Sequence, residues 1–310
     1  MKVVVTGGNG FVGKWLIKEL LKNNDIVYSI VRNNNKIPKE FLNDKNFYYI
    51  EMQNEHMTDL KLEDIGKVDC FYHLAWGGVS PEYKNDLSLQ LKNINLAIEM
   101  MDLSNYLKAN KFISAGTVAE YAFSEKIIDL SAKQTPNDYY GAAKVSTHYF
   151  LDVKARRDNC SFIWAMLPST FGEGRLNNNI ITYTIRELIR GNKPKYGNLN
   201  QMWDFLYVAD VADALRKIGL YGKKNALYGI GSGIYRPLKE YIYEIRDIIN
   251  PEAELGIGDY PELSNVTLSS CVNIEQLKKD TGFYPKTTFA EGIKKTIDYM
   301  KCIEKYEDRL

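Results

Sequence analysis

The chain has 310 residues, of which 45% are hydrophobic and 25% are charged, and its formal net charge is +1. This length can bury a large core, and the composition is that of a globular protein. The near-zero net charge excludes recognition of nucleic acid or of an anionic membrane surface through a strong overall field. No apolar run is long enough to span a bilayer, and the apolar stretch after Lys2 is too short for a signal peptide, so we expect a cytoplasmic protein.

Cysteine and histidine usage argues against a metal or redox centre. No pair of these residues has the spacing of a metal site or of a redox motif. We therefore expect free thiols in a reducing compartment and no bound metal. The residues concerned are Cys70, Cys160, Cys271, Cys302, His56, His73 and His148.

Strand and helix patterns alternate over the first half of the chain. Apolar, β-branched runs predict strands at residues 2–6, 26–31, 47–51, 68–75, 111–114 and 161–167. Helical periodicity predicts helices at residues 12–21, 83–109 and 139–157. This β-α-β succession is typical of a doubly wound parallel sheet.

The pattern changes after about Pro168, where segments become shorter and helices more frequent. Helices are predicted at residues 180–190, 208–221 and 238–248. We expect an α/β protein with a Rossmann domain over residues 1–168. A smaller, mostly helical substrate lobe is expected over residues 169–310, interleaved with the first domain.

A glycine-rich segment follows the first predicted strand. Gly7, Gly10 and Gly13 are three residues apart, which suits a tight turn, close approach of backbone N–H groups to a pyrophosphate, and close helix–strand packing. A turn that needs glycine only for its geometry would look similar in isolation. Here a strand precedes the motif and a helix follows it, which favours a dinucleotide bound at the helix N-terminus.

The end of the second predicted strand bears on the choice of dinucleotide. An acidic residue there would bind a ribose 2′-hydroxyl and indicate NAD. The strand contains no acid and is followed by Arg32, whose guanidinium can hold a 2′-phosphate through two parallel hydrogen bonds. Arg32 favours NADP(H) as the cofactor, with NAD(H) as the alternative; a solvated surface arginine is the other explanation.

Tyr140 and Lys144 are four residues apart at the start of a predicted helix, so they share one face. A free tyrosine has a pKa of about 10, and a neighbouring ammonium stabilises the phenolate. The pair can therefore exchange a proton with a substrate oxygen near neutral pH. Thr117 follows the fifth strand at the edge that faces the ligand crevice, where it can bind the same oxygen or simply cap the turn.

Together these features resemble the extended short-chain dehydrogenase/reductase family, which includes nucleotide-sugar epimerases, dehydratases and reductases. The resemblance covers nearly the whole chain. It implies that the catalytic residues are Thr117, Tyr140 and Lys144. It implies cofactor contacts by Gly7, Gly10, Phe11, Val12, Gly13, Arg32, Gln53, Leu74, Ala75, Trp76, Asn93, Tyr140, Lys144, Leu167 and Thr170. It implies substrate contacts by Thr117, Asn178, Trp203 and Arg236.

Three departures from the family pattern narrow the reaction. Arg32 replaces the NAD-type acid, and Val118-Ala119 stand where dehydratases carry an acidic pair, with a structural role expected for Glu120. Trp203 stands where many members have an arginine that meets the substrate pyrophosphate. Arg236 is the replacement that we expect for this contact.

The resemblance implies hydride transfer between a nicotinamide and a sugar carbon, with Tyr140 moving the hydroxyl proton. We expect NADPH-dependent reduction of a nucleotide-linked 4-keto-6-deoxy sugar in deoxy-sugar or surface-polysaccharide biosynthesis. The alternative is an NAD-dependent nucleotide-sugar 4-epimerase. A non-catalytic dinucleotide sensor is disfavoured, because Tyr140 and Lys144 are both present. The helices at 83–109 and 139–157 are those through which the family forms dimers, so a homodimer is expected.

Overall fold

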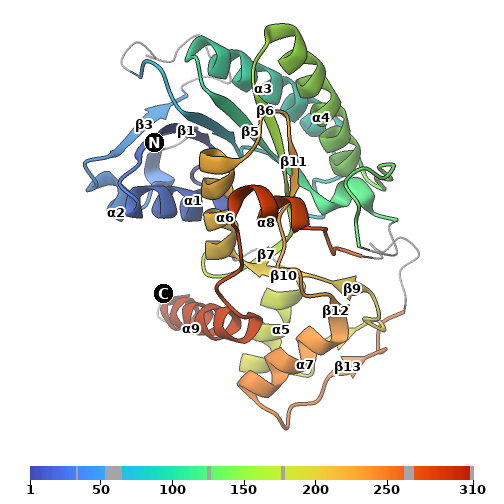
Figure 1. The fold of residues 1–310 in the computed structure, drawn as a ribbon. Helices are drawn as coiled ribbons and strands as arrows, with labels where there is room; N and C mark the ends of the chain where they lie inside the picture. The colour runs from blue at the N-terminus through green and yellow to red at the C-terminus, as the bar shows by residue number, and fades with distance from the viewer. Residues whose placement is uncertain (33, 53–64, 124–126, 176–178, 262–268, 308–310) are drawn as a thin grey trace.

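The computed structural model describes residues 1–32, 34–52, 65–123, 127–175, 179–261 and 269–307. Its centre is a parallel seven-stranded sheet with the order β11-β6-β5-β4-β1-β2-β3 (Figure 1). The strands are β1 Lys2–Thr6, β2 Ile26–Val31, β3 Phe47–Glu51, β4 Cys70–His73, β5 Lys111–Thr117, β6 Phe162–Leu167 and β11 Leu227–Gly229. The order reverses between β1 and β4, where open α/β sheets bind ligands. The predicted Rossmann fold is thus confirmed.

Helices cover both faces of this sheet (Figure 1). On one side lie α1 Phe11–Lys22, α2 Lys39–Leu42, α6 Val208–Tyr221 and α8 Glu275–Thr281, and on the other lie α3 Leu87–Tyr106 and α4 Tyr139–Asp158. Val3 and Val5 of β1 join the core beneath α1 and α6, whereas Val4 joins the core beneath α3 and α4. This alternation follows from the two-residue period of a strand, and it explains why the three consecutive valines are all apolar.

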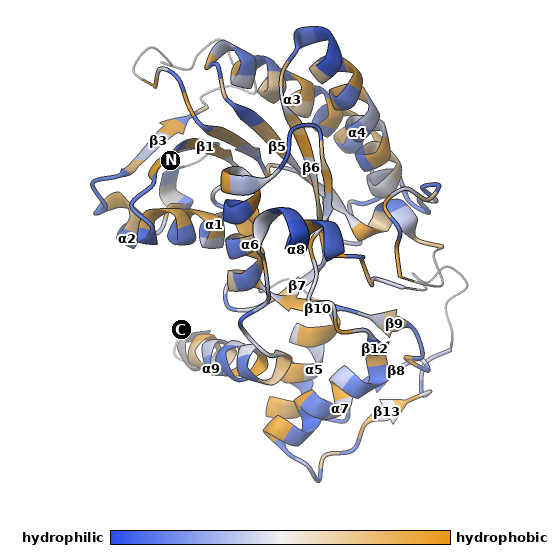
Figure 2. Cartoon of the chain, in the orientation of Figure 1, coloured by the Kyte–Doolittle hydropathy of each residue, from blue (hydrophilic) through white to orange (hydrophobic). Residues whose placement is uncertain are grey.

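A smaller lobe lies below the sheet in the view of Figure 1. It contains α5 Ile180–Ile189, α7 Leu238–Ile249, α9 Phe289–Glu307 and the short strand pairs β7 Ser169–Phe171 with β10 Phe205–Tyr207, β8 Lys195–Tyr196 with β13 Gly256–Ile257, and β9 Met202–Trp203 with β12 Arg236–Pro237. Figure 2 shows α5 as mostly hydrophobic and α8 as mostly hydrophilic, since α5 crosses the lobe core. The chain returns to the sheet at α6 and β11, while the boundary at residue 168 stays a prediction.

Several predicted element bounds were wrong. The helix predicted at 83–109 begins only at Leu87, because the Asp86 side chain accepts the backbone N–H of Leu89 at 3.0 Å and caps it. The strand predicted at 68–75 ends at His73, after which the chain crosses beside the glycine loop. The seventh strand, β11, was missed because three residues carry no periodic signal.

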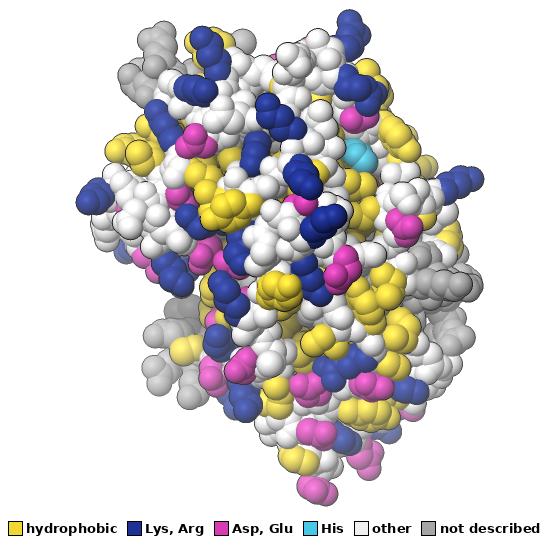
Figure 3. Space-filling model, viewed as in Figure 1, with side chains coloured by type: hydrophobic (Ala, Val, Ile, Leu, Met, Phe, Trp, Pro, Cys, Tyr) yellow, Lys and Arg dark blue, Asp and Glu magenta, His cyan; other side chains and the backbone are white. Residues whose placement is uncertain are grey.

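The surface carries charges of both signs. Figure 3 shows lysine and arginine side chains interspersed with acidic ones on the face in view, as the net charge of +1 leads one to expect. Within the described ranges, no helix is long and apolar enough to cross a membrane, and no group of three or more potential metal-ligating side chains is found. All four cysteines are free thiols.

Candidate active site

Two positions where the chain passes from β1 into α1, Gly7 and Gly13, have room only for glycine. Gly7 has a φ of +76°, and a Cβ atom on it would lie 2.6 Å from the backbone nitrogen of Ala75 and 2.7 Å from the carbonyl carbon of Leu74. The amide of Gly10 donates to the Gly7 carbonyl at 2.9 Å, and a Cβ atom on Gly13 would overlap that same carbonyl. The loop is therefore pressed against the segment after β4, with its backbone open toward the ligand side.

A pocket of about 700 Å³ opens beside this loop at the carboxyl ends of β1, β2 and β4. Its lining includes residues that the sequence predicted for the cofactor, namely Gly7, Gly10, Arg32, Leu74, Ala75, Trp76 and Asn93. Phe11 and Val12 form the first turn of α1 and do not line the pocket, and Gly13 packs against Gly7. Gln53 and Asn178, two further predicted contacts, lie outside the described residues.

The end of the pocket beside β2 is positively charged. Arg32 is exposed there, and Lys36, which the sequence analysis missed, joins it in the pocket wall. The acidic Glu51 at the end of β3 is engaged by Asn34, whose side-chain nitrogen donates to it at 3.0 Å. Within the described part of the chain, Arg32 has no ion-pair partner. Its guanidinium is free to meet an anionic group of a ligand.

Asn93 holds the loop that follows β4. Its side-chain oxygen accepts the Gly77 amide and its side-chain nitrogen donates to the Gly77 carbonyl, both at 2.9 Å. The neighbouring Gln90 accepts the indole N–H of Trp76 at 2.9 Å. Asn93 thus lines the pocket and also holds Gly77, another residue of the pocket wall, in place. In addition to the predicted cofactor contact, we expect Asn93 to position this loop.

The predicted catalytic residues come together between β5 and α4. Thr117 ends β5, and Asp138 caps α4 by accepting the Gly141 amide at 2.7 Å, which places Tyr140 and Lys144 on the first turns of the helix. The Thr117 side chain faces the Tyr140 phenol and, as a hydrogen-bond donor to the phenolate, acts to lower the pKa of Tyr140. The Lys144 ammonium donates to the carbonyl of Ala115 at 2.6 Å and lies 3.7 Å from the centre of the Trp76 ring.

Burial sets the protonation states of this group. It raises the pKa of Tyr140 to about 12, although the hydrogen bond from Thr117 works in the opposite direction. Burial also lowers the pKa of Lys144, and the negative charge of Glu120 offsets part of that effect. Below the pair, burial lowers the pKa of His73 to about 3, so this histidine is neutral. Tyr140 without ligands therefore holds its proton and can act as an acid.

Arg175 is a site residue that the sequence analysis missed. It donates to the carbonyl of Thr170 at 2.7 Å, and its guanidinium lies 5.6 Å from the ring centre of Phe11. Its positive charge acts to lower the pKa of Tyr140, and its Nε is buried without a hydrogen-bond partner among the described residues. Two predicted cofactor contacts precede Arg175 in the chain: Leu167 is the last residue of β6 and Thr170 lies in β7.

Trp203 and Arg236 are brought together by the structure. They are register partners in the antiparallel pair of β9 and β12. Arg236 forms an ion pair with Glu244, and its guanidinium lies 3.8 Å from the ring centre of Tyr241. The Nε1 of Trp203 and the Nε of Arg236 are both buried, with no partner in the ranges that the structure describes. Two buried donors on neighbouring strands are thus left without a partner among the described residues.

Asp204 fixes the strand beside this pair. It is fully buried and accepts hydrogen bonds from the amides of Ser232 and Gly233 at 2.9 and 3.3 Å. Burial raises its pKa to about 6, despite these bonds. Asp204 therefore ties the start of β10 to the loop before β12, and its carboxylate is used by these internal hydrogen bonds.

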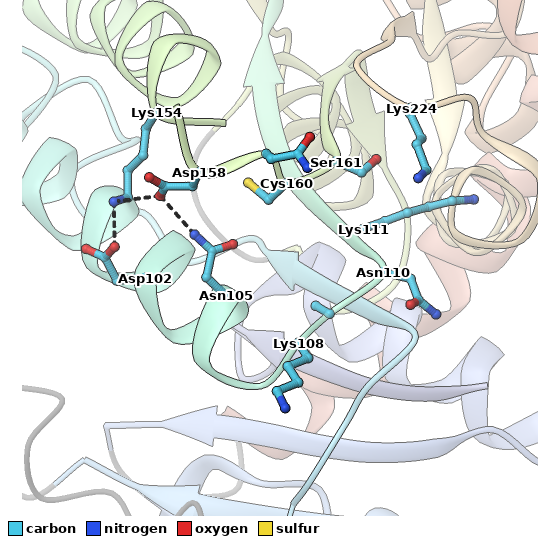
Figure 4. A pocket seen from close by; sticks show the side chains of 12 residues that line it. Asp102, Asn105, Lys108, Asn110, Lys111, Lys154, Asp158, Cys160, Ser161 and Lys224 are labelled. Atoms are coloured by element: carbon cyan, nitrogen blue, oxygen red, sulfur yellow. Dashed lines mark hydrogen bonds and ion pairs between the residues drawn. The ribbon is translucent and has the colours of Figure 1, made fainter. Parts of the chain in front are cut away.

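A second pocket, of about 820 Å³, lies at the amino ends of the strands, where β5 and β6 begin. Figure 4 shows Lys154 between Asp102 and Asp158, at 2.5 and 3.0 Å from their carboxylates. Lys111 donates to the Gly219 carbonyl at 2.8 Å. These lysines have internal partners, and the pocket contains none of the predicted site residues.

The fold, glycine loop and catalytic group define a dinucleotide-dependent oxidoreductase of the extended short-chain type. The model of the NAD dependent epimerase/dehydratase family matches residues 3–231, so the chain belongs to this family. Its members act on nucleotide sugars as epimerases, dehydratases and reductases, and this chain is an enzyme of that class.

Individual relatives are distant but cover the chain well. The dTDP-4-dehydro-6-deoxyglucose reductase of Escherichia coli is 24% identical over 97% of this chain and 98% of its own length. The dTDP-6-deoxy-L-talose 4-dehydrogenase (NAD(+)) of Aggregatibacter actinomycetemcomitans is 23% identical over 79% of this chain and 89% of its own. The UDP-glucuronic acid 4-epimerase of Bacillus cereus, solved with UDP-glucuronic acid and NAD, shares the fold with a TM-score of 0.86 at 20% identity, covering 98% of this chain and all of that one.

Proposed function

We propose that the protein is an NADPH-dependent reductase of a nucleotide-linked 4-keto-6-deoxy sugar. The observation that carries this proposal is the pair of cations, Arg32 and Lys36, in the pocket wall beside β2, where an NAD-type site would present an acid. A cofactor with a 2′-phosphate fits two cations better than a 2′-hydroxyl does. A reductase needs a reductant that binds, reacts and leaves, which suits NADPH.

The turn after Thr117 argues against elimination of water. Val118 and Ala119 offer no acid there, and the first carboxylate along the chain, Glu120, points inward. It accepts the amide of Thr117 at 2.8 Å and the indole N–H of Trp164 at 3.2 Å, and its exposed fraction is 0%. A base that removes a proton from a sugar carbon must reach the substrate, and Glu120 does not.

The catalytic residues divide the work as follows. NADPH, when bound, supplies the hydride to the carbonyl carbon of the sugar. Tyr140 donates its phenolic proton to the sugar oxygen, which becomes a hydroxyl, and Thr117 holds that oxygen in line. The nearby Lys144 charge stabilises the phenolate that remains. A protonated Tyr140 in the resting site suits reduction, because the reaction begins by consuming that proton.

We infer that the substrate extends from this group toward the smaller lobe. The positive charge of Arg175 acts to lower the pKa of Tyr140, and its guanidinium suits an electron-rich oxygen of the sugar or phosphate. Trp203 and Arg236, with their partnerless buried nitrogens, suit the nucleotide part. Their ion-pair and ring contacts hold them in place for that role.

Two measurements test the proposal against the 4-epimerase alternative. A thermal-shift panel of nucleotide sugars with each dinucleotide identifies the pair that stabilises the native state. The near-ultraviolet absorbance of NADPH then follows turnover. We expect NADPH to be oxidised only when a nucleotide-linked 4-keto sugar is present. Tightly retained NAD, with epimer formation that needs no added cofactor, would instead establish the epimerase.

Replacing Arg32 by Ser is expected to lower kcat/KM for NADPH about 10- to 100-fold, the loss that corresponds to one charge-assisted hydrogen-bonded contact. The kcat/KM for NADH should change less than about threefold, because NADH has no 2′-phosphate for Arg32 to bind. An effect of that size is about what substitutions at distant, independent sites produce. Arg157→Ser, which removes an exposed arginine at the end of α4, is the matched control. Equal losses for NADPH and NADH would show that Arg32 does not meet a 2′-phosphate.

We further propose that the protein is a homodimer through α3 and α4. Both helices expose large apolar side chains, which is unusual on a helix that faces only water. They are Leu87, Leu91, Tyr106, Tyr139, Tyr149, Phe150 and Val153. Light scattering at micromolar concentration should give twice the chain mass, and Leu91→Glu combined with Phe150→Glu should give the monomer. Tyr221→Glu, on an equally exposed aromatic of α6, should leave the dimer intact.

A further inference from the structure

Glu120 lies beneath the catalytic group, where the reaction described above does not use it. It belongs to the 3₁₀ turn Val118–Tyr121, and Thr117 and Glu120 cap each other reciprocally across that turn. Capping needs only the polar oxygen that accepts the Thr117 amide. A glutamate instead puts a carboxylate with an exposed fraction of 0% inside the protein, which is costly unless something compensates the charge.

The groups that donate hydrogen bonds to Glu120 are neutral, so they do not balance the negative charge of its carboxylate. Its oxygens accept the neutral Thr117 amide and the neutral Trp164 indole, the latter at 3.2 and 3.3 Å from the two oxygens. A Cβ atom on Gly116 would lie 2.8 Å from one carboxylate oxygen and would overlap the Trp164 indole. Backbone, indole and carboxylate are therefore packed tightly, so the carboxylate has one position.

Lys144 is a buried cation that lacks a counter-charge in direct contact. Its exposed fraction is 4%, its ammonium donates to the Ala115 carbonyl, and its remaining neighbours include the faces of Trp76 and Trp164, with ring centres at 3.7 and 5.8 Å. No carboxylate in the described ranges lies within ion-pair distance of it. A buried ammonium in such surroundings tends to lose its proton.

The charged and titratable groups around this centre can be sorted by element. Glu120, from the 3₁₀ turn, is the group whose negative charge favours the protonated Lys144. Burial raises the pKa of Glu120 to about 7, and the Lys144 charge works in the opposite direction. His73, from β4, is neutral because it is buried. The negative charges of Glu120 and Asp138 raise the pKa of Tyr140, and Arg175 lowers it. The ammonium of Lys84 lies 5.4 Å from the centre of the Tyr140 ring. The carboxylate and the ammonium are thus matched across the Trp164 indole, which contacts both.

We propose that Glu120 is the buried counter-charge that keeps Lys144 protonated, and that it is therefore a positioning residue of the catalytic group. The inference rests on the proposed role of Lys144 beside Tyr140. Without the Glu120 charge, Lys144 becomes a neutral amine at a lower pH. The Tyr140 phenolate that forms during turnover then loses the stabilisation that the Lys144 charge would provide.

Two substitutions separate charge from shape. Glu120→Gln keeps the length and the acceptor oxygen of the cap but removes the charge, whereas Glu120→Asp keeps the charge but shortens the reach to the Thr117 amide. The titration of Lys144 is followed by NMR in protein with 13C-labelled lysine side chains, with Lys144→Met used only to assign its signal. This measurement needs no substrate, so it is independent of whether the protein reduces a keto sugar.

We expect Glu120→Gln to lower the pH midpoint of Lys144 by about one pH unit or more, the effect of removing a nearby opposite charge. Glu120→Asp should keep the midpoint close to that of the unaltered protein. Where turnover is measurable, kcat should be lost as the pH rises and Lys144 gives up its proton. In Glu120→Gln this loss should occur at a correspondingly lower pH, with little change in KM. An unchanged pH midpoint of Lys144 in Glu120→Gln would overturn the proposal, because it would mean that the Glu120 charge does not act on Lys144. A residue that only caps the turn should tolerate Gln better than Asp.

The unaltered protein gives a second test, which holds even if Glu120→Gln does not fold. With 13C-labelled glutamate, the Glu120 carboxyl signal should show an ionised group over the pH range in which Lys144 carries its proton. A Glu120 that stays protonated while Lys144 is charged would overturn the proposal equally.

Discussion

Replacing Tyr140 by Phe should reduce kcat about 100- to 10,000-fold, the usual contribution of a positioned acid or base. Phenylalanine keeps the ring that packs against Trp76 with centres 6.3 Å apart, but it has no proton for the sugar oxygen. NADPH affinity should stay within about twofold, because the loss falls on the chemical step rather than on ground-state binding. Stopped-flow mixing of the variant with NADPH and substrate measures both quantities.

The neighbouring residue provides the control. Tyr139 is a largely exposed tyrosine one position earlier on α4, so Tyr139→Phe removes a phenol from the same helix turn without touching the Thr117 hydrogen bond. Its kcat should match that of the unaltered protein. If Tyr140→Phe turned over normally, or if Tyr139→Phe lost as much, the proton donor would have been assigned to the wrong residue.

The second large effect is expected at Gly7. A Gly7→Ala change combines two penalties, a side chain at a φ of +76° and a Cβ atom 2.6 Å from the Ala75 nitrogen. Strain and overpacking of about 1–3 kcal/mol each should lower the free energy of unfolding by roughly 3 kcal/mol in total. Displacement of the loop should also weaken dinucleotide binding at least about 100-fold, since the phosphate site depends on backbone position. Chemical denaturation and calorimetric titration measure the two effects.

Gly191 separates the two penalties. Its φ is +73°, nearly the same as that of Gly7, but a Cβ atom there would meet nothing within 4 Å. Gly191→Ala should therefore cost only the backbone strain of about 1 kcal/mol and leave dinucleotide affinity unchanged. Equal losses of affinity at both positions would mean that the close approach to Ala75 does not shape the site.

The sequence predicted well those parts of the molecule that are specified locally. The glycine spacing between β1 and α1 reflects contacts within one loop and its neighbouring strand, and i, i+4 spacing alone places Tyr140 and Lys144 on one face. Val3, Val4 and Val5 of β1 are all apolar because both faces of the strand are covered. The alternation of strand and helix patterns predicted the parallel sheet.

The parts that were missed depend on contacts between distant segments. β11 exists because three residues pair with β6 more than sixty positions away. Arg175 reaches the catalytic group only because its loop folds back over Phe11, which no spacing reveals. Glu120 was expected to be structural, and its cap agrees with that, but its position opposite Lys144 follows from how β5, α4 and Trp164 pack together.

The most direct test of the reductase assignment is transfer of a label from cofactor to sugar. The protein is incubated with a nucleotide-linked 4-keto-6-deoxy sugar and NADPH deuterated at the nicotinamide C4 position, on either face in separate reactions. Mass spectrometry of the product should show one deuterium gained per NADPH oxidised, for one of the two faces, with NMR locating it at C4 of the sugar. A product without deuterium from either labelled cofactor, or epimers formed while NADPH remains unconsumed, would contradict the assignment.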